Sequence, residues 1–235
     1  MREQNSTVSS YNSSSELQRI IAQKLYAEIE KRLKFQERSA CEIGCGTGFL
    51  TNELLNGVVK KLTCVDKSKI FCNFIEQNYQ EKIADLSLEV ICDDFTGFDR
   101  INKFDLYLSS MSLQWIGDWI CGDFFPRIAD KKYAFAIPIF GSLNAIFDKM
   151  KLYGIHSNIL EFCHQDKYVD SLKCADFFVD NFSEKVEFST ALKRLQVYKY
   201  GNQVVKSNNF IAIKKALQDN EMIEFTYKVL FLFRL

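Results

Sequence analysis

The chain has 235 residues, 47% of them hydrophobic, and its thirty basic and thirty acidic residues leave a formal net charge of zero. This length allows one sizeable core, and zero net charge is a poor electrostatic profile for a dedicated nucleic-acid binder. The polar N-terminus lacks the apolar core of a secretory signal, and the longest apolar run, FTYKVLFLF, is too short to span a bilayer as a helix. We therefore expect a soluble, cytoplasmic protein with neither a membrane nor a nucleic acid as partner.

The eight cysteines do not have metal-site spacing. None forms a CxxC pair, and His156 and His164 are not placed around them as zinc ligands are. We predict reduced cysteines that serve as small core residues, and no metal.

The first part of the chain alternates predicted helices and strands. Helices are predicted at 16–35, 49–55, 68–83 and 118–129, and strands at 40–43, 60–66, 86–94, from 104 onward and at 131–140. This alternation indicates an α/β protein with a mainly parallel sheet and helices on both faces.

The later part is less regular. Helices are predicted at 142–153, 166–179, 190–198 and 208–218, and strands at 184–188 and 224–233. No composition shift marks a domain boundary, so we predict a single domain over 1–235. Within it, 1–35 is predicted to form an N-terminal lid and 190–220 a helical cap.

The stretch CEIGCGTG places Gly44, Gly46 and Gly48 between a predicted strand and a predicted helix. In an open parallel sheet, ligands bind there, beyond the carboxyl ends of the strands, and glycine lets them approach bare backbone. The spacing is not the G-x-G-x-x-G of a dinucleotide site, and no lysine or arginine lies between Cys41 and Lys60 to serve as a phosphate-binding P-loop residue. A purely structural tight turn is the alternative.

Acidic residues end the next two predicted strands. Asp66 is placed to accept hydrogen bonds from ribose hydroxyls, and Asp93 to accept one from an adenine amine. Asp94 and Phe95 follow, offering a backbone amide and an aromatic face. Together with Glu42 near an amino group, these residues predict an adenosine ligand without phosphates, and S-adenosylmethionine (SAM) fits.

These motifs, CEIGCGTG, VDKS, CDDF and FDLYLSS, resemble those of class I SAM-dependent methyltransferases. The resemblance implies a Rossmann-like, seven-stranded, mostly parallel sheet with a reversed last strand, in which 184–188 and 224–233 are strands six and seven. It also implies cofactor contacts. By motif position these are Glu42, Gly44, Gly46, Asp66, Asp93 and Ser109, to which we add Cys45, Gly48, Lys67, Asp94 and Phe95.

The loop after the fourth predicted strand, SSMSLQWIGD, has no Asn-Pro pair of the kind that nucleic-acid methyltransferases use to hold a base amine. With FGSLNAI, the N-terminal YNSSSELQR and the closing FTYKVLFLF, it resembles the malonyl-acyl-carrier-protein O-methyltransferases of biotin synthesis. The resemblance implies methylation of the free carboxylate of a malonyl thioester, carried by an acyl carrier protein or by coenzyme A. The stretch QNSTVSS before Tyr11 departs from that family's pattern.

A malonyl carboxylate is already ionised at neutral pH, so the site needs alignment more than a general base. We predict that Tyr11 acts on the acceptor, that Trp115 walls an apolar pocket, and that Lys193 or Arg194 binds the carboxylate. For each, a merely structural or solvated role is the alternative. Acyl carrier proteins are acidic, so docking needs a basic patch, for which the candidates are Lys131, Lys132, Lys193, Arg194, Lys199, Lys214 and Lys215.

Two other functions fit the same residues. One is a carboxyl methyltransferase for a free small molecule such as trans-aconitate. The other is a SAM-binding protein without catalysis.

Overall fold

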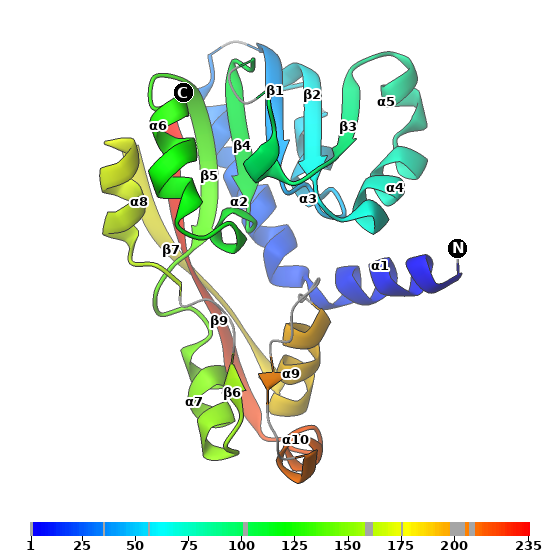
Figure 1. Cartoon of the computed structure of the whole chain (residues 1–235), viewed down its shortest axis with the longest axis vertical. Helices are drawn as coiled ribbons and strands as arrows, with labels where there is room; N and C mark the ends of the chain where they lie inside the picture. The colour runs from blue at the N-terminus through cyan, green and yellow to red at the C-terminus, as the bar shows by residue number, and fades with distance from the viewer. Residues whose placement is uncertain are drawn as a thin grey trace.

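The structure is a computed structural model that describes residues 2–34, 36–55, 57–100, 103–157, 162–174, 176–197, 205–206 and 210–235. Its main feature is a seven-stranded sheet with strand order β3-β2-β1-β4-β5-β9-β7 (Figure 1). The strands are β1 (Glu37–Ile43), β2 (Val59–Asp66), β3 (Leu88–Cys92), β4 (Leu106–Ser110), β5 (Lys132–Pro138), β7 (Asp176–Glu187) and β9 (Met222–Arg234). The first five strands pair in parallel, and β9 is antiparallel to both β5 and β7. This confirms the predicted Rossmann-like sheet with its reversed last strand.

Ten α-helices are described alongside this sheet. They are α1 (Arg2–Ser14), α2 (Glu16–Arg32), α3 (Phe49–Leu54), α4 (Lys69–Asn78), α5 (Gln80–Ala84), α6 (Phe125–Ile128), α7 (Asn144–Leu152), α8 (Gln165–Leu172), α9 (Phe188–Val197) and α10 (Phe210–Ala216). A π-helical segment, Ile120–Phe124, leads into α6. A further two-stranded sheet pairs β6 (His156–Ser157) with β8 (Val205–Lys206).

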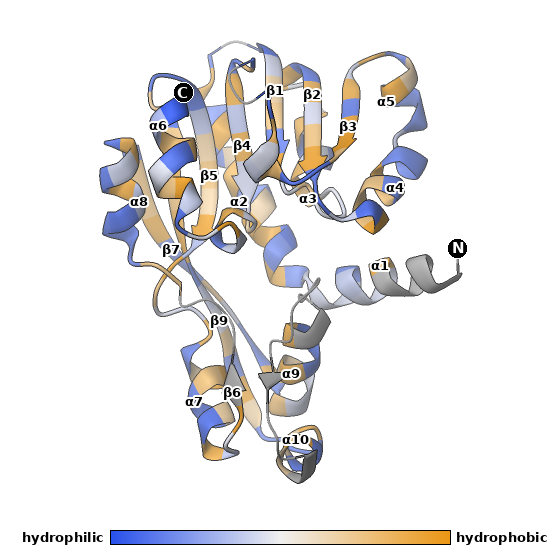
Figure 2. Cartoon of the chain, viewed as in Figure 1, coloured by the Kyte–Doolittle hydropathy of each residue, from blue (hydrophilic) through white to orange (hydrophobic). Residues whose placement is uncertain are grey.

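Alternation along the strands sorts the core into two layers, because successive side chains of a strand point to opposite faces. Leu106 and Leu108 of β4 belong to the hydrophobic cluster that includes α2, α3, α7 and α9, whereas Tyr107 belongs to the one that includes α6 and α8. Both faces are therefore covered, and Figure 2 shows apolar colour along the central strands. Near-continuous burial of β4 and β5 is what a parallel sheet covered on both sides requires.

The strands β7 and β9 form a long ribbon that runs beyond the rest of the sheet. Their pairing extends from Asp176 opposite Phe233 to Glu187 opposite Met222, whereas β5 pairs only with the segment 229–234 of β9. Around the free end of this ribbon lie α7, α9 and α10, which form the lower lobe in Figure 1. Helix α1 leaves the start of α2 between this lobe and the main sheet.

The structure corrects two of the predicted elements and adds one that was not predicted. Residues 176–179, predicted as helix, are strand, because β7 begins eight residues before the predicted 184 and pairs with β9. The predicted helix 68–83 is divided into α4 and α5 at Tyr79, whose φ of −122° is not helical. The polar leader is the helix α1.

No helix in the described part of the chain is long and apolar enough to cross a membrane.

Candidate cofactor and acceptor site

The glycine loop joins β1 to α3 at the carboxyl edge of the sheet. All three glycines have positive φ: +68° at Gly44, +54° at Gly46 and +89° at Gly48. A Cβ on Gly44 would lie 1.7 Å from the Oγ of Ser112, and one on Gly48 would lie 2.6 Å from the Cδ1 of Ile75. These two glycines therefore let the loop pack against the segment after β4 and against α4.

Gly46 differs from Gly44 and Gly48 because a Cβ built there would clash with no neighbouring atom. The nearest heavy atom to a Cβ built there is the Tyr11 hydroxyl, at 4.0 Å. Its N–H donates to Oδ2 of Asp66 over 2.9 Å. The Gly46 backbone thus lines the cavity under α1 without a side chain in the way of a ligand.

Asp66 ends β2 and holds the glycine loop in place. Its Oδ2 accepts from the Gly46 N–H and its Oδ1 accepts from the Ser68 N–H at 2.8 Å. Burial raises the pKa of Asp66, while these two backbone donors lower it. Because a carboxylate offers about four lone-pair sites, both oxygens can still accept from ribose hydroxyls.

Glu42 lies beneath the loop at the end of β1 and is only 2% exposed. Its Oε2 accepts from the Thr51 hydroxyl at 2.7 Å and from the Cys64 thiol at 3.5 Å. Burial raises the pKa of Glu42 to about 7. The carboxyl lines the same cavity as the loop glycines, where an ammonium group would favour its charged form.

At the end of β3, the Asp93 side chain is exposed and its Oδ1 accepts from the Asp94 N–H. Asp94 caps the turn that follows, accepting from both the N–H and the hydroxyl of Thr96. Phe95 is only 5% exposed and its ring packs edge-on against Phe124 at 5.1 Å. The Phe95 ring, which was expected to contact a purine, is therefore largely part of the hydrophobic core.

The three other predicted cofactor contacts differ in their exposure to solvent. Lys67 is exposed beside Asp66. Cys45 is buried in the loop, and a contact with the Cys64 thiol together with burial raises the pKa of its thiol. Ser109 is fully buried, and its hydroxyl donates to the carbonyl of Ile43 at 2.8 Å, which ties β4 to β1.

Helix α1 packs over the glycine loop. The Tyr11 ring lies 5.1 Å from the ring of Phe71 and 6.5 Å from that of Phe49, centroid to centroid. Beside it, Oδ1 of Asn12 accepts from the hydroxyl of Thr47 at 2.6 Å. These contacts bring Tyr11 to the predicted cofactor loop from a segment more than thirty residues away.

A cavity of about 50 Å³ remains between α1, α2 and the loop. Its lining includes four predicted cofactor residues together with Tyr11, Gln18, Ser110 and Met111. Ligand pockets usually measure about 300–1,000 Å³, so this space is a small enclosed remnant. Motif analysis missed Gln18 and Ser110, although both lie within quoted motifs, ELQR and FDLYLSS.

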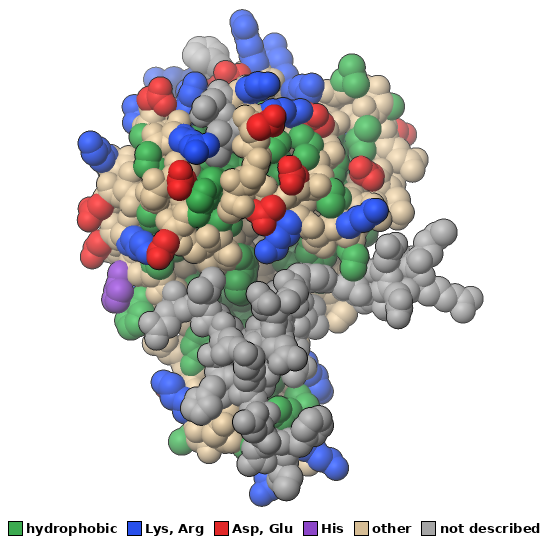
Figure 3. Space-filling view, viewed as in Figure 1, with side chains coloured by type: hydrophobic (Ala, Val, Ile, Leu, Met, Phe, Trp, Pro, Cys, Tyr) green, Lys and Arg blue, Asp and Glu red, His purple; other side chains and the backbone are tan. Residues whose placement is uncertain are grey.

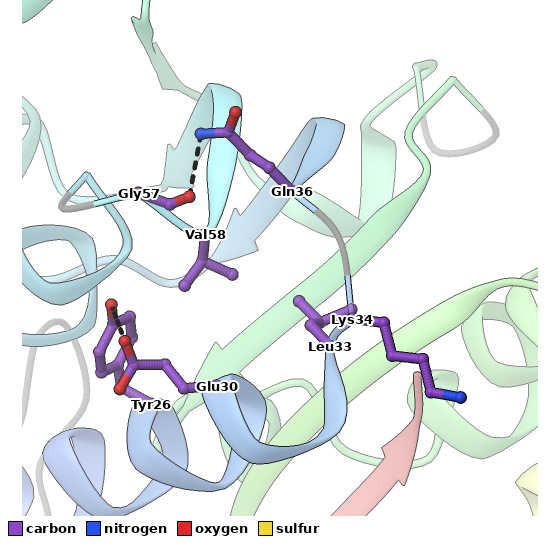
Figure 4. Close-up of a pocket in the computed structure, with 7 residues that line it drawn as sticks. All are labelled: Tyr26, Glu30, Leu33, Lys34, Gln36, Gly57 and Val58. Atoms are coloured by element: carbon purple, nitrogen blue, oxygen red, sulfur yellow. Dashed lines mark hydrogen bonds between the residues drawn. The ribbon is translucent and has the colours of Figure 1, made fainter.

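A larger cavity of about 290 Å³ lies at the opposite, amino edge of the sheet. Figure 4 shows its lining, in which the Tyr26 hydroxyl donates to Glu30 at 2.8 Å and the Gln36 amide donates to the carbonyl of Gly57 at 2.9 Å. The ammonium of Lys34 points away from it. None of the predicted site residues lies there.

The predicted acceptor residues are not gathered together. Trp115 is 40% exposed in the turn after β4. Lys193 is exposed on α9, whereas the guanidinium of Arg194 pairs with Glu184 at 2.6 Å and lies over the Phe225 ring. Arg194 is thus engaged within the protein.

The candidate basic patch is also divided. Lys131 and Lys132 lie at the start of β5, on the amino edge, where Lys132 pairs with Glu37. Lys214 and Lys215 lie on α10 in the lower lobe, which also contains α9 and its Lys193. Lys199 is outside the described residues. On the face in Figure 3, charged side chains of both signs intermix over the main sheet, and those visible on the lower lobe are Lys and Arg.

All eight cysteines are free thiols. Within the described ranges, no three His, Cys, Asp or Glu side chains come close enough to hold a metal ion.

Comparison with known proteins defines the class. Residues 40–130 match the family described as "Methyltransferase domain". In its fold the chain is similar to the YcgJ protein of Bacillus subtilis, with a TM-score of 0.58 at 12% identity, covering 90% of this chain and 98% of that one. It is also similar to a geranyl diphosphate methyltransferase solved in complex with SAM. The TM-score is 0.54 at 10% identity, and the match covers 90% of this chain and 84% of that one. The fold is that of class I SAM-dependent methyltransferase domains, and the match over residues 40–130 supports SAM as the cofactor.

Within that class, the chain resembles malonyl-[acyl-carrier protein] O-methyltransferases. The relative from Priestia megaterium is 28% identical over 112 residues, and that from Anoxybacillus flavithermus is 31% identical over 97 residues. These matches cover 47% and 41% of this chain but only 39% and 36% of the relatives' own lengths. A ribosomal RNA small subunit methyltransferase A from Mesomycoplasma hyopneumoniae is 35% identical over 72 residues, 31% of this chain and 26% of that relative.

Proposed function

We propose that this chain transfers a methyl group from SAM to the free carboxylate of a malonyl thioester, borne by an acyl carrier protein or coenzyme A, in the synthesis of a biotin precursor. One observation carries the proposal: α1 brings Tyr11 over Gly46, into one cavity with Ser110 and Met111 from the end of β4. The two relatives named malonyl-[acyl-carrier protein] O-methyltransferases support the choice of acceptor.

The residues present fit SAM. Gly46 offers bare backbone, Asp66 has acceptor capacity for the ribose, Asp93 is exposed for the adenine amine, and Glu42 is a buried carboxyl suited to the ammonium. When bound, SAM supplies an electrophilic methyl group: a carboxylate lone pair forms the O–C bond, while the C–S bond breaks and its electron pair stays on sulfur.

No proton moves in this reaction, so the protein needs no general base. Its part is to align the carboxylate and to exclude water. The Tyr11 hydroxyl donates a hydrogen bond to the acceptor, and Trp115 contacts its apolar part. In this proposal residues 1–35 are the lid and 190–220 part of the cap of a single domain.

The lid opens and closes in this scheme. With α1 packed on the loop, the remaining cavity of about 50 Å³ has room for about one or two water molecules, far less than the methionine end of SAM needs. Cofactor entry therefore requires that the Tyr11 and Asn12 contacts separate from the loop, and reclosure then covers the reacting groups.

The lower lobe supports an acidic carrier as partner. Lys193 lies there on α9, and Lys214 and Lys215 on α10. Positive charge on that surface would attract an acidic protein and raise its rate of encounter.

Rescue of growth without biotin tests this proposal. A bacterial strain lacking its malonyl-carrier methyltransferase should grow when it expresses this chain, and should fail to grow when it expresses the Asp66→Ala variant at equal level. Failure of the unaltered, soluble chain to restore growth would contradict the proposal.

A further inference from the structure

Ser110 is the last residue of β4 and lines the cavity beneath α1 together with Tyr11. Its Oγ is buried and has no hydrogen-bond partner in the described part of the chain. Buried hydroxyls in proteins are nearly always hydrogen-bonded, and leaving one without a partner is costly. An unpartnered hydroxyl that lines a cavity can form its hydrogen bond with a bound ligand.

The backbone after Ser110 is fixed in an uncommon conformation. Met111 has a φ of +56°, in the left-handed region that non-glycine residues seldom adopt. Its N–H donates to the carbonyl of Ala136 at 2.9 Å, and its carbonyl accepts from Nε2 of Gln114 at 2.7 Å. Such strain persists only where the surroundings hold it, and it is concentrated at functional sites. These two hydrogen bonds hold the backbone next to Ser110 in position.

The described lining of the cavity carries no cationic side chain. Among its described lining residues there is no lysine, arginine or histidine, and the one carboxyl, Glu42, lies beneath the loop. An acceptor carboxylate loses its negative charge as the ester forms. A cation bound to it would stabilise the reactant more than the transition state and slow the transfer. A neutral donor orients the carboxylate and has this effect to a smaller degree.

We propose that Ser110 is a positioning residue for the acceptor: its hydroxyl donates to one carboxylate oxygen and leaves the lone pair of the other free to attack the methyl carbon. The C–S bond of SAM breaks as the new O–C bond forms, its electron pair stays on sulfur, and the Ser110 proton stays on Ser110. This inference rests on the proposed function. It needs no contact from Arg194, whose guanidinium pairs with Glu184.

The test compares Ser110→Ala with Ser110→Thr, which keeps a hydroxyl, and with Ser87→Ala, which removes an exposed hydroxyl bonded to the Lys82 carbonyl. For each variant, kcat, KM, SAM affinity and Tm are measured with a malonyl carrier protein. Calorimetry also measures binding of that carrier to protein saturated with S-adenosylhomocysteine.

Ser110→Ala should lower kcat/KM by roughly 10- to 150-fold, the value of one hydrogen bond to a charged group. Carrier binding should weaken, SAM affinity and Tm should stay unchanged, Ser110→Thr should recover most of the loss, and Ser87→Ala should behave as the unaltered chain. A normal kcat/KM in Ser110→Ala, or a loss matched by an equal loss of SAM affinity, overturns the role of Ser110 but not the proposed function. No turnover by the unaltered chain overturns the proposed function and the assignment with it.

Discussion

Glu42, a candidate cofactor residue, should also affect the stability of the fold. Its pKa is raised to about 7 by burial, against 4.5 for an ordinary glutamate. The folded protein therefore keeps this proton up to about pH 7, while the unfolded chain has already lost it. The stability that comes with the neutral carboxyl is fully present below about pH 4.5 and is lost as pH rises through 7.

Glu42→Gln should remove that pH dependence, because the amide cannot ionise but can still accept from Thr51 and Cys64. Above pH 7 the variant should be more stable than the unaltered chain by on the order of 3 kcal/mol, and the difference should vanish towards about pH 4. Urea unfolding at several pH values measures this. A difference that stays constant with pH would show that Glu42 ionises normally in the folded state. The same variant should bind SAM more weakly.

Asp66 is expected to bind ribose and also holds the loop through Gly46. Asp66→Ala should weaken SAM binding by roughly 30- to 150-fold, which corresponds to about 2–3 kcal/mol for a charged acceptor. Asp85→Ala is a matched control, since Asp85 accepts from the Ser87 N–H two residues on, as Asp66 does from Ser68, but lies in a turn after α5. Calorimetry that finds equal SAM affinity for the two folded variants would refute the assignment.

The residues of the candidate cofactor loop were largely predictable from the sequence, whereas the surroundings of the candidate acceptor residues were not. Glu42, Gly46 and Asp66 follow from the spacing of one short motif and from an acid at a strand end, which are local features. The pairing of Arg194 with Glu184 and the unpartnered hydroxyl of Ser110 depend on packing between elements. No periodicity encodes such contacts.

Helix α1 is the element on which the proposed lid depends. Tyr11→Phe keeps the ring contacts with Phe49 and Phe71 and removes one hydroxyl, so Tm and SAM affinity should barely change. The methylation rate should fall by roughly 10- to 150-fold, the effect of losing one hydrogen bond to a charged group. Deletion of residues 1–14 should reproduce the loss. Stopped assays with saturating SAM measure both.

Tyr79→Phe is the control for this prediction, because its hydroxyl is bonded to Asn52 and neither residue lines the cavity. It should keep the full rate. Near-normal turnover in both Tyr11→Phe and the deletion variant would show that α1 is no lid and that Tyr11 has no part in catalysis.

Elements with a strong hydrophobic periodicity were predictable. Elements that form only against a neighbouring part of the fold were not. Helix α2 and strands β1 to β5 carry patterns that fit one structure. Residues 176–179 read equally well as helix, and β7 becomes strand there only because β9 offers a partner along its full length. The leader is too polar to fold alone, and α1 exists against the surface that the loop and α4 provide.

The chain has two parts: the main sheet, which carries the candidate cofactor site, and a lower lobe built on the β7–β9 extension. The matched family covers residues 40–130, which belong to the first of these parts. The names of the relatives give different acceptors, and we expect α1, the segment after β4 and the lower lobe to select the acceptor of this chain. These are the parts for which sequence patterns say least.

The most direct test is methylation of defined acceptors by the purified chain with SAM that carries an isotopically labelled methyl group. Malonyl carrier protein, malonyl-coenzyme A and free trans-aconitate are offered separately, and mass spectrometry locates the label. The account predicts one labelled methyl ester on the malonyl carboxylate of a thioester, with little transfer to trans-aconitate. Label on trans-aconitate alone, or tight SAM binding without transfer to any of the three, would contradict it.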